Sequence, residues 1–126
     1  MPLRHCRILC VSFDDVVSRS RVRSLKDAGY EATATTSIDE GMELLNRDRF
    51  DAVIVGHRFS TEEKHLLALY ATEKTNTAVV LVCGASSESA IPATSRVYAL
   101  EGNAGLLAAL AQLFSKEATA MSRAAA

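Results

Sequence analysis

The sequence predicts a doubly wound α/β fold, in which helices cover both faces of a five-stranded parallel sheet. Three observations lead to this prediction: five short apolar segments, longer amphipathic segments that alternate with them, and helix-start patterns that open several of the latter. Continuous apolar runs are typical of strands that are buried on both faces. Strands that alternate with helices indicate parallel pairing through right-handed crossovers.

The first strand is predicted at residues 7–13 (RILCVSF), which form a short apolar run. Asp14 and Asp15 follow and predict a helix start, because an aspartate oxygen accepts a hydrogen bond from the first backbone N–H groups of a helix. Gly29 is a typical stop for that helix, since glycine readily adopts the left-handed backbone found there. Residues 30–35 (YEATAT) alternate and predict the second strand.

The next two helices are predicted from their first residues. Ser37 and Glu40 match a capping box, and the helix that they open extends to about Arg49. Residues 51–56 (DAVIVG) then predict the third strand. Residues 60–63 (STEE) repeat the capping-box pattern and open another amphipathic helix.

Two strands and a final helix are predicted in the C-terminal part. Residues 78–83 (AVVLVC) form the most apolar strand, and residues 96–100 (RVYAL) predict a weaker fifth strand. Residues 84–95 are small and polar and include Pro92, so we expect a loop or one short helical turn. Asn103 is expected to cap the final helix. Its apolar residues form two stripes, the first for the core and the second for a broad core face or a partner surface: Leu106, Leu110 and Leu113, then Leu107 and Phe114.

Length and composition indicate one domain with a real core, since the chain has 126 residues and a hydrophobic content of 48%. We expect residues 1–6 to be a tail, residues 7–115 the domain, and residues 116–126 a tail or a helix extension. The net charge of −1 argues against nucleic-acid or membrane-surface binding. Three cysteines predict reduced thiols, and no apolar run could span a bilayer, so we expect a soluble, cytoplasmic protein.

A ligand crevice in such a fold lies beyond the carboxyl ends of the strands. The residues that follow those ends are the candidate site: Ser12, Phe13, Asp14, Asp15, Gly56, His57, Arg58, Cys83, Leu100 and Glu101. Positive charge is concentrated near the N-terminus and is expected to be a solvated helix face, with Arg19 and Arg23 as helical neighbours and Arg21 pointing elsewhere: Arg4, Arg7, Arg19, Arg21, Arg23 and Lys26.

Four segments stand in an order and spacing that match a known family: ILCVSFDD, LKDAGYEA, SIDEGMELL and FDAVIVG. From residue 7 to about residue 114 the chain resembles the receiver domain of bacterial two-component response regulators, which are CheY-like. The resemblance implies a flavodoxin-like sheet of strand order 2-1-3-4-5 and a role in phosphorelay signal transduction. It also implies a fourth helix, which residues 84–95 would make short or irregular.

The chemistry of that family requires an acidic pair, an acceptor aspartate, a hydroxyl and a lysine around a divalent cation. Matched residue by residue, those places fall on Ser12 and Phe13, Gly56, Cys83, and Leu100 or Glu101. Glycine cannot accept a phosphoryl group. Asp51 cannot replace it, because it begins the strand that Gly56 ends, about 16 Å away. The resemblance is therefore to a degenerate receiver that lacks its acceptor.

The function predicted is that of a pseudo-receiver without enzymatic activity, metal or cofactor, which binds a signalling protein or a second copy of itself. One alternative is an atypical response regulator that is phosphorylated with the help of Asp14 or Asp15. The simpler structural interpretation is that these two residues only cap a helix. Another alternative is a thiol-based sensor, in which His57 activates Cys83. The simpler structural interpretation is that Cys83 is a buried core thiol.

Overall fold

Five parallel strands form one sheet in the computed structural model, which describes residues 6–84 and 91–125. The strands are β1 (Arg7–Val11), β2 (Glu31–Thr35), β3 (Ala52–Val55), β4 (Ala78–Cys83) and β5 (Ser95–Tyr98). Their order is β2-β1-β3-β4-β5, and every neighbouring pair is parallel. The predicted fold class and strand order are therefore confirmed.

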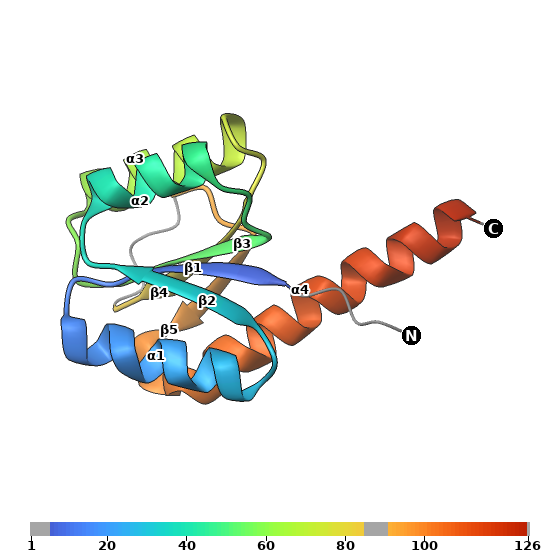
Figure 1. Cartoon of the computed structure of the whole chain (residues 1–126), viewed down its shortest axis with the longest axis horizontal. Coiled ribbons are helices and arrows are strands. Elements are labelled where there is room, and N and C mark those ends of the chain that lie inside the picture. Colours follow the sequence, from blue (N-terminus) through green and yellow to red (C-terminus); the bar gives the residue numbers. More distant parts are fainter. Residues whose placement is uncertain (1–5, 85–90, 126) are drawn as a thin grey trace.

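Two helical layers enclose the sheet (Figure 1). The helices are α1 (Asp15–Asp27), α2 (Ile38–Arg47), α3 (Thr61–Glu73) and α4 (Gly102–Ala125), with a 3-10 turn at Ala99–Glu101 before the last. Helices α2 and α3 cover one face, and α1 and α4 cover the other. No helix in the described part of the chain is long and apolar enough to cross a membrane.

Each face of the sheet has its own buried cluster. Leu9, Val53 and Leu81 point toward α2 and α3, whereas Ile8, Ile54 and Val80 point toward α1 and α4. Successive residues of the central strands thus reach opposite cores, which is why these strands are apolar at every position. Leu106, Leu110, Leu107 and Phe114 all pack on the second core, so the two stripes of α4 form one broad core face.

The starts of α1 and α3 follow the predicted chemistry, and the start of α2 follows it in part. Asp14 caps α1 by accepting a hydrogen bond from the N–H of Val16 at 2.8 Å, and Ser60 with Glu63 forms a complete capping box on α3. Ser37 caps α2, but the Glu40 carboxylate accepts a hydrogen bond from the Thr35 hydroxyl instead of closing the box. The predicted capping box of α2 is therefore only half formed.

Several predicted boundaries are wrong. The first strand ends at Val11 and not at Phe13, and the fifth ends at Tyr98, where a 3-10 turn begins at Ala99. Asn103 lies inside α4 and does not cap it; its side chain donates to the hydroxyls of Ser20 and Ser24 on α1, each at 3.0 Å. The Asn103 side chain therefore bonds to α1 instead of to the first backbone N–H groups of its own helix. The predicted short fourth helix falls mainly on residues 85–90, outside the described residues, and residues 91–94 are not helical.

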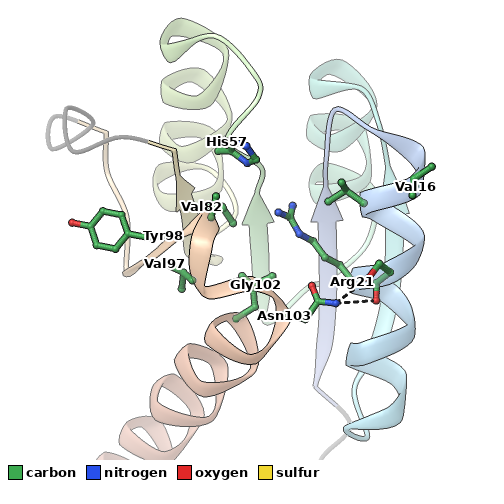
Figure 2. A pocket seen from close by; sticks show the side chains of 12 residues that line it. Val16, Arg21, His57, Val82, Val97, Tyr98, Gly102 and Asn103 are labelled. Carbon is green, nitrogen blue, oxygen red and sulfur yellow. Dashed lines mark hydrogen bonds between the residues drawn. The ribbon is translucent and has the colours of Figure 1, made fainter.

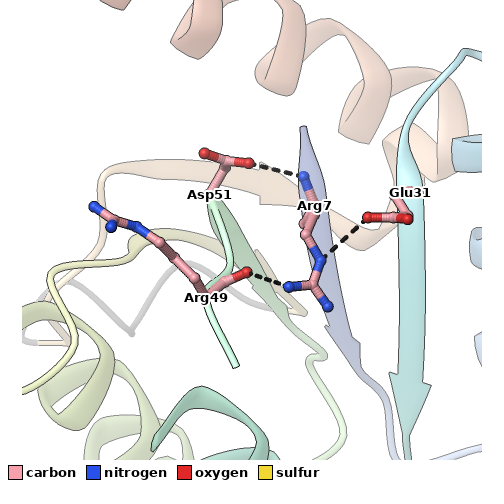
Figure 3. A network of polar contacts seen from close by, with 4 residues as sticks. All are labelled: Arg7, Glu31, Arg49 and Asp51. Atoms are coloured by element: carbon pink, nitrogen blue, oxygen red, sulfur yellow. Dashed lines mark hydrogen bonds and ion pairs between the residues drawn. The ribbon is translucent and has the colours of Figure 1, made fainter. Parts of the chain in front are cut away.

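Arg7 also departs from the solvated face predicted for it. It joins three segments at the amino edge of the sheet: its Nε pairs with Glu31 at 3.1 Å, its Nη1 donates to the carbonyl of Arg49, and its guanidinium lies over Phe50 (Figure 3). Its backbone N–H donates to Asp51 at 2.8 Å. Asp51 therefore lies at the edge opposite the strand ends that carry the candidate site.

Candidate functional site

The ends of β1 and β3 approach each other closely at the carboxyl edge of the sheet. Val11 is paired with Val55, and the N–H of Gly56 donates to the carbonyl of Val11 at 2.8 Å. A Cβ atom at position 56 would lie 3.1 Å from that carbonyl oxygen and 3.3 Å from the Cα atom of Ser12. Both neighbours are backbone atoms, so this close approach favours glycine.

Arg21 reaches into the same place from α1. Its residue is only 7% exposed, and its Nη1 donates to the hydroxyl of Ser12 at 2.9 Å. The same nitrogen would lie 3.4 Å from a Cβ atom at position 56. A guanidinium thus occupies the gap between the ends of β1 and β3.

Arg21 points away from Arg19 and Arg23, as expected, but it is buried and not solvated. The buried residues of α1 are Ser18, Arg21 and Leu25, which are three and four residues apart and so share the inward side of the helix. This spacing relative to Leu25 was the signal that sequence reasoning missed. Arg19, two positions earlier, does face solvent and pairs with Asp15 at 3.1 Å.

The acidic residues near this edge are already engaged by cations. Asp14 pairs with Arg58 at 3.4 Å in addition to capping α1, and Asp15 pairs with Arg19. Among the described residues, no group of three or more His, Cys, Asp or Glu side chains could hold a metal ion. The local charge is therefore balanced at Asp14 and Asp15 and positive at Arg21.

A buried polar chain runs from Arg21 through Ser12 to Cys10. The Cys10 sulfur lies 3.4 Å from the Ser12 hydroxyl. Burial raises the pKa of the Cys10 thiol, and the hydrogen bond with Ser12 and the positive charge of Arg21 oppose this rise without cancelling it. Cys10 is therefore a protonated core thiol at neutral pH.

Lys64 is a second buried cation that sequence reasoning missed. It lies in the first turns of α3, is 1% exposed, and donates from its Nζ to the backbone carbonyl of His57 at 3.0 Å. This bond holds the segment between β3 and α3. The ring of His57 packs against Gly84, where a Cβ atom would lie 3.2 Å from the His57 Cδ2 atom.

The structure brings only part of the predicted crevice together. A small hollow of ≈ 10 Å³ is lined by Ser12, Phe13, Asp14, Val17, Arg21, Gly56, His57 and Arg58. Such a volume is about what one water molecule needs. Phe13 is largely exposed and meets Phe59 edge to face, with ring centroids 5.8 Å apart.

The other four predicted residues do not line the hollow, and one of them, Asp15, is the first residue of α1 and pairs with Arg19. Cys83 is buried in the core beneath α2 and α3, and its sulfur lies 3.9 Å from the carbonyl oxygen of Leu81. Leu100 and Glu101 lie on the 3-10 turn, where Leu100 is completely exposed. Glu101 accepts a hydrogen bond from the N–H of Tyr98 at 3.1 Å.

Solved structures with the same architecture identify this fold. A response regulator receiver domain protein from Methanospirillum hungatei aligns with a TM-score of 0.78 and 17% identity, over 92% of this chain and 98% of its own. The chain has a receiver fold. A receiver protein from Sinorhizobium medicae aligns with a TM-score of 0.78 and 22% identity, over 90% of this chain and 98% of its own. A response regulator from Thermotoga maritima aligns with a TM-score of 0.77 and 17% identity, over 89% of this chain and 99% of its own.

Comparison by sequence found no match: no protein-family model matches the chain, and no curated protein matches it. In this receiver fold, the described carboxyl edge between β1 and β3 holds a buried guanidinium, a neutral hydroxyl and a glycine. Such a set favours an anion and disfavours a hard cation, which needs several oxygen ligands of negative charge.

Proposed function

We propose that this chain is a non-phosphorylated pseudo-receiver, a protein-interaction module of two-component signalling without catalytic activity. The observation that carries the proposal is the Arg21 guanidinium beside Gly56, in the place where phosphoryl transfer would need carboxylates around Mg²⁺. A fixed positive charge repels a divalent cation, and glycine offers no oxygen to a phosphoryl group. The hollow of ≈ 10 Å³ also leaves no room for a hydrated metal.

Exposed apolar side chains support a role in protein contact. Four of them lie at or just beyond the carboxyl ends of β1 and β5, and we call these four the apolar rim: Phe13, Val16, Tyr98 and Leu100. Their exposed fractions are 61%, 74%, 55% and 101%, so all four side chains are accessible to a partner protein. The partner proposed is a signalling protein of the same pathway. A second copy of the chain is the alternative, and sedimentation over a range of concentrations distinguishes the two.

The direct test is a mass measurement after incubation with acetyl phosphate and Mg²⁺. We expect no added phosphate and no Mg²⁺-dependent binding of beryllofluoride, because the strand ends carry no acceptor oxygen on residue 56. The Asp14→Asn variant is the matched comparison. An added phosphate on the parent chain that disappears in this variant would overturn the proposal in favour of an atypical, phosphorylated regulator.

The thiol-based alternative predicts a reactive Cys83, whereas its burial predicts an inert one. We expect Cys10 and Cys83 to react with iodoacetamide about a hundredfold more slowly in the native chain than in urea, since alkylation requires local opening. Peptide mapping assigns each thiol, and Cys6, which is partly exposed, is the internal reference. Native reaction of Cys83 as fast as that of Cys6 would contradict the core-thiol interpretation.

A further inference from the structure

A second, much larger cavity adjoins the small hollow. It has a volume of ≈ 390 Å³ and lies between α1, the ends of β4 and β5, and the start of α4 (Figure 2). Its walls are mainly apolar and include Val17, Val82, Val97 and Leu106. A volume of this size is typical of cavities that bind one small organic molecule.

Polar contacts between the helices border this cavity. Asn103 at the start of α4 donates to the hydroxyls of Ser20 and Ser24 on α1, each at 3.0 Å. Asn103 and Ser20 both line the cavity, and dashed lines mark the hydrogen bonds of Asn103 in Figure 2. The cavity is therefore built between two helices that a specific hydrogen bond holds in register.

Arg21 brings a buried positive charge to this cavity. Figure 2 shows its side chain extending from α1 between the two helical walls toward the strand ends. Only 7% of the surface of Arg21 is exposed, and its side chain donates a hydrogen bond to the Ser12 hydroxyl. Among the described ion pairs, none includes Arg21.

This leaves a guanidinium with most of its five N–H donors uncommitted in a largely apolar environment. Removing a charge from water without a counter-charge is costly, so the arrangement favours an anion beside Arg21. No aspartate or glutamate lines the cavity to supply that charge from within the described chain. Asp14, which lines the adjoining hollow, is paired with Arg58, so the large cavity is the place where an anionic ligand would meet Arg21.

The rest of the lining agrees with an anionic ligand that has an apolar body. The N-terminus of α4, a helix of 24 residues, meets the cavity at Gly102 and Asn103, where the helix dipole is positive. The apolar walls offer nothing to a small hydrated anion such as inorganic phosphate. A carboxylate fits the planar guanidinium through two parallel hydrogen bonds.

We propose that this cavity binds a small organic carboxylate, with its carboxylate on Arg21 and its apolar body against Val82, Val97 and Leu106. Gly56 does not line this cavity, but Arg21 lines both the cavity and the small hollow at Gly56, so the proposed site adjoins the acceptor position. The pseudo-receiver would thus carry a ligand site in place of a phosphorylation site. The inference stands independently of the chain's response to acetyl phosphate, which the mass measurement decides.

The test is a titration of the full chain with 2-naphthoate, followed by methyl NMR. We expect saturable shifts and probe contacts at the methyl groups of Val82, Val97 and Leu106, and binding about tenfold or more weaker for the neutral isostere 2-naphthamide. Arg21→Met should weaken 2-naphthoate binding to the level of the amide. Arg19→Met is the matched control, because Arg19 lies on the same helix with its side chain 81% exposed.

Three results would overturn the proposal: no saturable binding of 2-naphthoate or octanoate below about 5 mM, equal affinity for the acid and the amide, or probe contacts confined to Phe13 and Leu100, which do not line the cavity. The acid–amide comparison uses the parent chain alone. It therefore decides the matter even if Arg21→Met does not fold.

Discussion

Replacing Gly56 with aspartate is expected to destabilise the chain without making it a phosphoryl acceptor. A Cβ atom at this position would lie 3.1 Å from the Val11 carbonyl oxygen and 3.3 Å from the Ser12 Cα atom. These backbone atoms can yield only if the paired strand ends move, so we expect a loss of about 1–3 kcal/mol in the free energy of unfolding. The new carboxylate would also lie beside the Arg21 guanidinium and pair with it, leaving no oxygen for Mg²⁺.

Urea denaturation measures the first effect, and the mass change with acetyl phosphate and Mg²⁺ measures the second. The control is Gly56→Ala, which introduces the same Cβ atom without a charge and therefore isolates the steric part. An aspartate variant that is as stable as the parent and gains a phosphate would show that the strand ends can open. It would also show that Arg21 does not block the acceptor position.

Replacing Arg21 with methionine is expected to raise the free energy of unfolding of the ligand-free chain by about 1–2 kcal/mol. The substitution removes a buried charge that has no described ion-pair partner and keeps a side chain of similar length. The hydrogen bond to Ser12 is lost, but that hydroxyl keeps its contact with the Cys10 sulfur at 3.4 Å. A gain in stability would mean that the guanidinium is retained for a purpose other than folding.

Urea denaturation of the parent, Arg21→Met and Arg19→Met measures this difference, and Arg19→Met should change the stability by less than about 0.5 kcal/mol. Addition of 2-naphthoate should then stabilise the parent but not Arg21→Met, since a ligand stabilises only the state that binds it. A variant that loses more than about 1 kcal/mol would indicate that the folded chain already compensates the Arg21 charge.

Local chemistry predicted the elements of this fold well. The cap at Asp14, the left-handed backbone at Gly29 with φ +96° and the box at Ser60 each depend on residues within a few positions of one another. Apolar runs identified the strands because central parallel strands are buried on both sides. Strand ends were less predictable: Phe13 and Leu100 are apolar, yet both lie beyond their strands and are exposed.

Site residues that directly follow a strand in the sequence could be predicted, whereas site residues that are placed by tertiary packing could not. The sequence alone placed Gly56 at the end of β3 and Asp14 at the start of α1, since both follow directly from the strands before them. It could not place Arg21 and Lys64, which are charged residues that the structure buries. Whether such a side chain faces solvent or the sheet depends on how its helix rotates onto the sheet. That rotation results from contacts between residues far apart in the chain, and no local pattern records it.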